Sequence, residues 1–255
     1  KKKNQKKINI LKKLPQNNTY NLVIIATNSL ERFEILKKII KNNKIGYFLL
    51  EKMIFTKIAH YDKSKYFTKN HANNIFVNVW GSLIVKLLNI MAIKKNPPIQ
   101  FKAKIKEGRF ITNLVHYIDM FCALTEKKID FNIMLNKIFD SKRKPYKEAS
   151  GRLSGFNNLG NILIESDPNI VTDTIIIKNR KDTYKILINK NKSIFYFKNS
   201  KLIKKIKFPF AYLFTYKIFE NYMIKNKKNS IIKNFNFVSL ISREIVKKIE
   251  KIKIT

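Results

Sequence analysis

Residues 22–27 read Leu-Val-Ile-Ile-Ala-Thr, an apolar run rich in β-branched side chains. A continuous run of this kind predicts a strand that is buried on both faces, as strands of parallel sheets are. Asn28 and Ser29 follow the run and can cap a helix, and Glu31 and Glu34 would stabilise the positive end of that helix. We therefore predict a strand that leads directly into a helix.

The segment after this strand predicts a complete βαβ unit. Phe33, Leu36 and Ile40 recur at helical spacing, Gly46 follows the expected helix end, and residues 47–50 form a second apolar run. A strand, a crossover helix and a second strand form a right-handed unit of a parallel sheet. Ligands of such sheets bind at the carboxyl ends of the strands. The polar residues at these ends are therefore site candidates: Thr27, Asn28, Ser29, Glu51 and Lys52.

The remaining chain predicts two domains separated at the sequence Asn96-Pro97-Pro98, which interrupts regular structure. Residues 1–97 are expected to form an incomplete nucleotide-binding, Rossmann-like domain. Residues 98–255 are expected to form a substrate and catalytic α+β domain that C-terminal helices close. The expected elements are strands at 74–79, 99–105, 147–165, 170–178, 184–189 and 193–198, and helices at 83–91, 111–124, 209–224 and 237–252.

The fold class predicted from this order is α/β. A partial Rossmann-like parallel sheet comes first, followed by an α+β domain with an open, mainly antiparallel sheet. Residues 99–105 alternate between apolar and polar side chains, which predicts a strand with one face in water.

The net charge of +36 would favour an anionic partner. Only six of the 53 basic residues are Arg, however, and Arg is the residue that nucleic-acid recognition favours. The excess of Lys, Asn and Ile also runs through the whole chain, as in genomes biased toward A and T. We therefore expect a solvated, lysine-rich surface that attracts anionic substrates, and regard a nucleic-acid partner as the less favoured alternative.

Cysteine and histidine usage predicts a reducing, cytoplasmic setting without a metal site. Cys122 is the only cysteine, so neither a disulfide framework nor a cysteine-based zinc site is expected. His60, His71 and His116 do not have the spacing of metal ligands. No apolar run reaches the ~18 residues of a membrane-spanning helix.

Three segments in order resemble one enzyme family. Residues 23–29 followed by Leu50-Glu51-Lys52 are similar to its "IAT" strand end and "EKP" motif, with Met53 in place of the proline. Residues 113–119, Asn-Leu-Val-His-Tyr-Ile-Asp, resemble its "H-x-x-D" helix. Residues 141–143 followed by Glu148 are similar to a segment in members encoded with surface-polysaccharide enzymes. The family is that of the glucose-fructose oxidoreductases and inositol dehydrogenases (Gfo/Idh/MocA).

The resemblance implies two catalytic residues, Lys52 and His116, and NAD or NADP as the cofactor. Lys52 would lie beside the nicotinamide and the substrate hydroxyl, where a partly buried ammonium loses stability and can relay a proton. Glu51 would orient Lys52. His116 would act as acid or base, because imidazole titrates near neutral pH. The alternatives are a solvated ion pair at the strand end for Glu51 and Lys52, and a structural helix histidine for His116.

Further residues are expected to bind substrate or cofactor. Asn113 and Asp119 are expected to share a helix face with His116, Asn113 binding a sugar hydroxyl and Asp119 fixing the tautomer of His116. Lys142 and Arg143 would hold an anionic group of a sugar or nucleotide diphosphate, or else contribute only surface charge. Asn78 ends the third expected strand, and it too has two interpretations: it would contact nicotinamide or substrate, or it would be a turn residue. Many family members carry an Asp where this chain has Thr112, four residues before His116, so we expect either a simpler proton relay or a larger share of it for Lys52.

One family feature is missing. The family opens with a G-x-G-x-x-G turn that places the pyrophosphate on a helix N-terminus, but here no glycine precedes Gly46. We expect that the chain starts after the first βαβ unit, that residues 22–27 lack a neighbouring strand, and that this chain alone binds the cofactor weakly or not at all.

The sequence thus predicts a nicotinamide-dependent oxidoreductase that acts on a hydroxyl or carbonyl of a sugar or nucleotide-sugar. We expect homo-oligomers that pair through the sheet of the second domain. Two alternatives remain open: a basic RNA-binding protein of ribosomal type, and a catalytically inactive, truncated family member.

Overall fold

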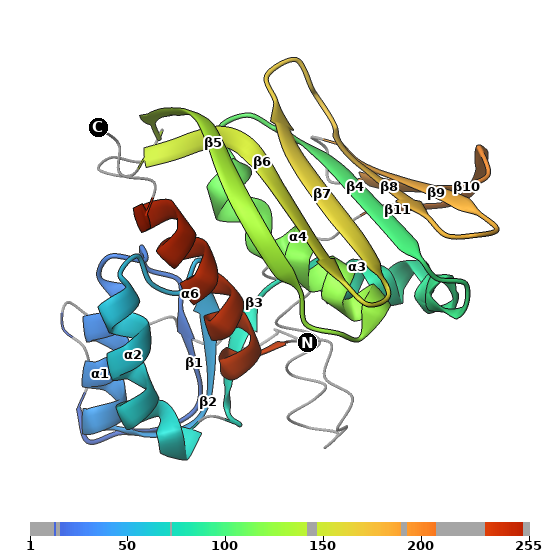
Figure 1. The fold of residues 1–255 in the computed structure, drawn as a ribbon. Coiled ribbons are helices and arrows are strands. Elements are labelled where there is room, and N and C mark those ends of the chain that lie inside the picture. The colour runs from blue at the N-terminus through green and yellow to red at the C-terminus, as the bar shows by residue number, and fades with distance from the viewer. Residues whose placement is uncertain are drawn as a thin grey trace, which may run out of the picture.

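The computed structural model describes residues 13, 16–71, 73–141, 147–189, 193–207 and 233–251, which form two sheets (Figure 1). In the smaller sheet, β1 (Thr19–Ile25), β2 (Lys44–Glu51) and β3 (Ile75–Asn78) are parallel, and β12 (Lys233–Asn234) joins β3 in the antiparallel sense. Glu51 lies opposite Asn78 in the register of β2 and β3. The carboxyl ends of these strands therefore meet at one edge.

Helices α1 (Arg32–Asn42) and α2 (Ile58–Thr68) lie side by side against the smaller sheet (Figure 1), and the short helix η1 (Lys69–His71) follows α2. Phe33 of α1 stacks on His60 of α2 with ring centroids 4.2 Å apart. The helix α2 was not expected from the sequence, because the polar and apolar side chains of residues 58–68 do not separate clearly onto two faces.

Three sequence predictions about the first unit need correction. Strand β1 is not buried on both faces: Ile24 is 51% exposed, and β1 is an edge strand with only β2 beside it in the described sheet. Helix α1 begins at Arg32, since the Asn28 side chain forms a turn by accepting the N–H groups of Leu30 and Glu31. Gly46 lies within β2 and not between helix and strand.

The larger sheet has eight strands in the order β11-β10-β9-β8-β4-β7-β6-β5. Neighbours are antiparallel except β4 and β7, which are parallel. The strands are β4 (Ile99–Lys106), β5 (Asp130–Asp140), β6 (Lys147–Asn157), β7 (Gly160–Asp167), β8 (Asp173–Lys178), β9 (Thr183–Ile188), β10 (Ser193–Lys198) and β11 (Lys201–Lys207). The predicted fold class is confirmed, although β5 and β11 were not expected.

One face of the larger sheet is buried by helix α4 (Phe110–Thr125), which packs on β4, β6 and β7. The apolar residues of β4 are buried under this helix, while its alternate residues Gln100, Lys102 and Lys104 are exposed. The predicted half-exposed strand is therefore confirmed. Its alternation determines which face of the sheet meets α4.

Helix α6 (Phe235–Lys251) joins the two sheets (Figure 1). It contacts α2 and β3 on one side and α4 and β5 on the other. Arg243 of α6 donates two hydrogen bonds to the carboxylate of Asp62 on α2, at 3.1 and 3.3 Å. The predicted helix at 237–252 is confirmed, and the helix predicted at 209–224 lies outside the described residues.

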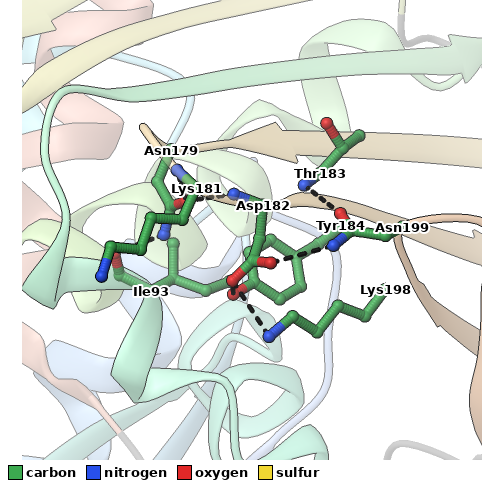
Figure 2. A network of polar contacts seen from close by, with 8 residues as sticks. All are labelled: Ile93, Asn179, Lys181, Asp182, Thr183, Tyr184, Lys198 and Asn199. Atoms are coloured by element: carbon green, nitrogen blue, oxygen red, sulfur yellow. Dashed lines mark hydrogen bonds and ion pairs between the residues drawn. The ribbon is translucent and has the colours of Figure 1, made fainter.

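Between the sheets, α3 (Gly81–Leu88) packs on α4, and the short helix η2 (Met91–Lys95) leads to β4. A polar network around Asp182 lies between β8 and β9, and its member Asn179 donates a hydrogen bond to the carbonyl of Ile93 in η2 (Figure 2). None of the described helices has the length and apolar character needed to cross a membrane.

Candidate functional site

The side chain of Lys52 connects the two parts of the molecule. It follows the last residue of β2 and reaches the first turn of α4, where its Nζ donates to the Thr112 carbonyl at 2.7 Å and to Asn113 Oδ1 at 2.8 Å. The ammonium group thus lies where the carboxyl end of the parallel sheet meets the helix of the second sheet. Ligands bind α/β sheets at this end.

His116 lies one helical turn beyond Asn113 on α4 and is only 3% exposed. Its Nδ1 accepts the backbone N–H of Trp80 at 3.3 Å, and the Trp80 indole stacks on the imidazole with centroids 4.4 Å apart. Burial holds the pKa of His116 well below its usual value, and the charge of Lys52 lowers it further. The imidazole is therefore neutral at neutral pH, and lies close enough to Lys52 to be affected by its charge.

Asp119 is completely buried and holds the start of α3. Its two carboxylate oxygens accept the backbone N–H and the hydroxyl of Ser82, both at 2.6 Å. A carboxylate is stabilised at a helix N-terminus by the backbone dipoles. Gly81 permits this approach, since a Cβ there would lie 2.1 Å from the carbonyl oxygen of His116. The Nδ1 of His116 has the Trp80 N–H as its partner, where the sequence suggested Asp119.

Glu51 and Asn78 form a polar pair across the ends of β2 and β3. The Asn78 amide donates to Glu51 Oε1 at 2.5 Å. Burial raises the pKa of Glu51, although Asn78 and the charges of Lys52 and Arg32 oppose the shift. Glu51 and Asn78 were both expected at this edge of the sheet. The structure pairs them there, and Lys52 follows Glu51 directly in the chain.

Arg32 is a residue that the sequence interpretation missed. Its buried guanidinium donates to the carbonyls of Glu51 (2.7 Å) and Ile54 (3.1 Å), and also to those of Thr27 and Met53. It therefore connects the segments that follow β1 and β2. One feature of the sequence could have revealed it. In a chain this rich in Lys, an Arg indicates a position where one planar side chain has to donate to several hydrogen-bond acceptors.

The other predicted cofactor residues lie after β1. The hydroxyl oxygen of Thr27 is buried and, among the described residues, has no hydrogen-bond partner. Asn28 is exposed and Ser29 is half-buried. Lys142 and Arg143 lie outside the described residues.

The residues present fit only part of a nicotinamide dinucleotide. Thr27, with its unpaired hydroxyl, and the Lys52 ammonium lie near the strand ends where the reactive end of such a cofactor would bind. No glycine-rich turn for a pyrophosphate precedes Gly46. Across the described part of the chain there is also no group of three His, Cys, Asp or Glu that could hold a metal ion.

No family model matches the sequence, and no curated protein matches it. Solved structures do match in fold. A UDP-N-acetylglucosamine 3-dehydrogenase from Acidithiobacillus ferrooxidans is 10% identical, with a TM-score of 0.63 over 92% of this chain and 78% of that chain. An oxidoreductase from Bacillus cereus is 14% identical, with a TM-score of 0.61 over 89% and 76%.

A third structure of the same fold is not described as an enzyme. It is the transcriptional regulator Gal80p from Kluyveromyces lactis, 13% identical, with a TM-score of 0.64 over 91% of this chain and 73% of that chain. The chain therefore has a fold that oxidoreductases and a regulator share. Because one fold hosts several functions, the activity has to be argued from the site.

Proposed function

We propose that the chain is a nicotinamide-dependent oxidoreductase that acts on a carbonyl or hydroxyl group of a sugar or nucleotide-sugar. The observation that supports this best is the position of Lys52. Its ammonium is anchored at 2.7 and 2.8 Å on the first turn of α4, one turn before the buried His116. These two groups come from different parts of the chain and converge where α/β sheets bind ligands.

The chemistry required at such a site is stabilisation of charge on one oxygen. During hydride transfer the oxygen of the reacting carbon gains or loses negative charge, and a fixed ammonium in a partly buried place stabilises that charge. NAD or NADP would supply or accept the hydride. Asn113 holds the ammonium in place through its Oδ1, so we assign it the role of positioning Lys52.

The proposed substrate class rests on charge and on fold. The net charge of +36 favours an anionic molecule such as a nucleotide-sugar, and one enzyme of the same fold is a UDP-N-acetylglucosamine dehydrogenase. Lys142 and Arg143 are proposed to bind the anionic part. A role in surface-polysaccharide synthesis remains part of this proposal.

We expect this chain to bind NADH or NADPH weakly, with a dissociation constant of roughly 1 mM or above, because its residues include no glycine-rich turn before Gly46. Trp80 is the only tryptophan and stacks on His116, so its fluorescence reports directly on the site. Titration with each cofactor should quench it only at such concentrations. Saturation at micromolar cofactor would contradict this expectation.

Turnover tests the proposal itself. The purified chain, supplied with cofactor in excess, is incubated with UDP-N-acetylglucosamine and NAD or NADP, and separately with the corresponding keto sugar-nucleotide and NADH or NADPH, while nicotinamide absorbance is followed. Activity in the wild type that is lost in Lys52→Ala and kept in Lys57→Ala, an exposed lysine on the surface, supports the proposal. Equal rates in both variants would refute the assigned role of Lys52.

We also propose that copies of the chain pair through the open face of the larger sheet. Light scattering after gel filtration measures this directly. The RNA-binding alternative predicts something different: affinity for RNA that falls steeply as salt rises, through release of counterions.

A further inference from the structure

The hydrogen bond between Trp80 and His116 determines which ring nitrogen carries the proton. The backbone N–H of Trp80 points at Nδ1 of His116 over 3.3 Å. A backbone N–H is only a donor, so Nδ1 has to be the acceptor. A neutral imidazole that accepts at Nδ1 carries its single proton on Nε2.

The direction of this N–H is fixed by its surroundings. Trp80 is the residue before α3, so its N–H is not used inside that helix. The two hydrogen bonds from Ser82 to Asp119 and the close approach at Gly81 hold the start of α3 against α4. The indole of Trp80 also stacks on the imidazole of His116. Trp80 therefore determines both the orientation of the imidazole ring and its tautomer.

Protonation of the second nitrogen is disfavoured. The His116 ring is almost completely buried, and the ammonium of Lys52 is close enough to oppose a second positive charge. Among the described residues, the other nitrogen, Nε2, has no hydrogen-bond partner. The proton on Nε2 therefore remains for a ligand.

We propose that Trp80 is a positioning residue that holds His116 as a neutral Nε2–H donor, and that the site consequently receives the carbonyl form of its substrate. The part that concerns the substrate rests on the function proposed above. A hydroxyl group that is to be oxidised must give its proton to an acceptor, whereas a carbonyl oxygen needs donors. Lys52 and His116 both present donors, and the oxygen of Asn113 already accepts from Lys52.

The test is an NMR measurement on the whole chain without ligand. The chain contains three histidines, so ¹⁵N-histidine labelling and long-range ¹H–¹⁵N correlation give a simple spectrum. The signal that disappears in His116→Gln is that of His116. We expect the Nε2–H tautomer of His116 in roughly tenfold excess or more, the ratio given by one net hydrogen bond. Predominant Nδ1–H, or a ring protonated on both nitrogens at neutral pH, overturns the proposal.

Two variants of Trp80 separate the backbone contact from the indole. Trp80→Ala keeps the N–H and should keep the Nε2–H tautomer, while Trp80→Pro lacks the N–H and should lose the excess. Retention of the excess in Trp80→Pro refutes the positioning role. Should Trp80→Pro not fold, the wild-type and Trp80→Ala spectra still decide the tautomer.

The outcome is distinguishable from failure of the proposed function, because the spectrum needs neither cofactor nor substrate. An Nε2–H tautomer in a chain without turnover leaves the positioning role intact and removes the substrate assignment. Turnover in a chain whose His116 carries its proton on Nδ1 keeps the function and rejects the donor role.

Discussion

Two polar clusters of this molecule differ in how they are built. The carboxylate of Asp182 (Figure 2) joins residues that are near in sequence: it accepts from Tyr184 (2.9 Å), Lys198 (3.0 Å) and Asn199 (2.9 Å). The site cluster joins Lys52, Trp80 and α4, which are far apart in the chain.

The electrostatics of the two clusters also differ. At Asp182, the hydrogen bond from Lys198 lowers the pKa of the carboxyl, and the positive charge of Lys198 balances the negative charge of the carboxylate. At the site, a charged Lys52 lies near a neutral, buried His116 whose pKa is depressed. A network in which each charge has its partner stabilises a hairpin. A cluster that keeps an ammonium beside a neutral imidazole is suited to bind an added oxygen, at some cost to stability.

The largest effect is expected at Lys52. Replacement by alanine removes the ammonium that we propose stabilises charge on the substrate oxygen, so kcat/KM should fall by roughly 10²–10⁴-fold. Steady-state kinetics measures this, with Asp182→Asn as the comparison in the second cluster. A similar loss of activity in Asp182→Asn, with the protein still folded, would remove the distinction between the two clusters.

Gly81→Ala should cause the next largest change. The added Cβ would meet the His116 carbonyl at 2.1 Å and the Met120 N at 2.5 Å, so α3 has to move away from α4. Overpacking of this kind costs about 1–3 kcal/mol in the free energy of unfolding. Urea denaturation measures it, and Ser154→Ala on the exposed face of the larger sheet is the control. An unchanged midpoint in Gly81→Ala would show that α3 does not rest on α4 as described.

Asp182→Asn should change the pH dependence of stability. Because the pKa of Asp182 is lowered in the folded protein, its contribution is present above the usual value of 3.8 and is lost as pH falls through the folded value. The variant should therefore be less stable than the wild type at neutral pH and approach it in acid. Denaturant midpoints along a pH series measure this, and parallel curves would contradict the assigned ion pair.

The smallest effect, opposite in sign, is expected at Glu51. Its pKa is raised by burial, so in the range just above the usual 4.5 the unfolded chain releases a proton that the folded chain retains. Stability then falls as pH rises through that range. Glu51→Gln keeps an oxygen for the Asn78 amide and should be at least as stable as the wild type at neutral pH. Clear destabilisation at neutral pH would mean that the ionised carboxylate is needed.

Much of the fold was predictable from local patterns. The alternation in β4 and the helical spacing in α4 depend on neighbours within a few residues, so both elements were predicted, and for β4 the exposed face as well. The apolar run at β1 wrongly predicted burial on both faces, because such a run does not reveal how many strands flank it; the missing neighbour was expected only from the family resemblance. The helix α2 was missed for lack of a clear apolar face.

The candidate site divides in the same way. The sequence by itself determined that Lys52 lies at the end of a strand, directly after β2, and that Asn113, His116 and Asp119 lie along one helix, because both follow from spacing along the chain. Only the tertiary structure decided the partners of these groups: Trp80 for His116, Ser82 for Asp119, and the carbonyls bound by Arg32. The bonds of His116 and Asp119 join residues as far as 37 positions apart and depend on how α3 and α4 meet, and those of Arg32 depend on how β1 and β2 are paired, which no local period of the sequence encodes.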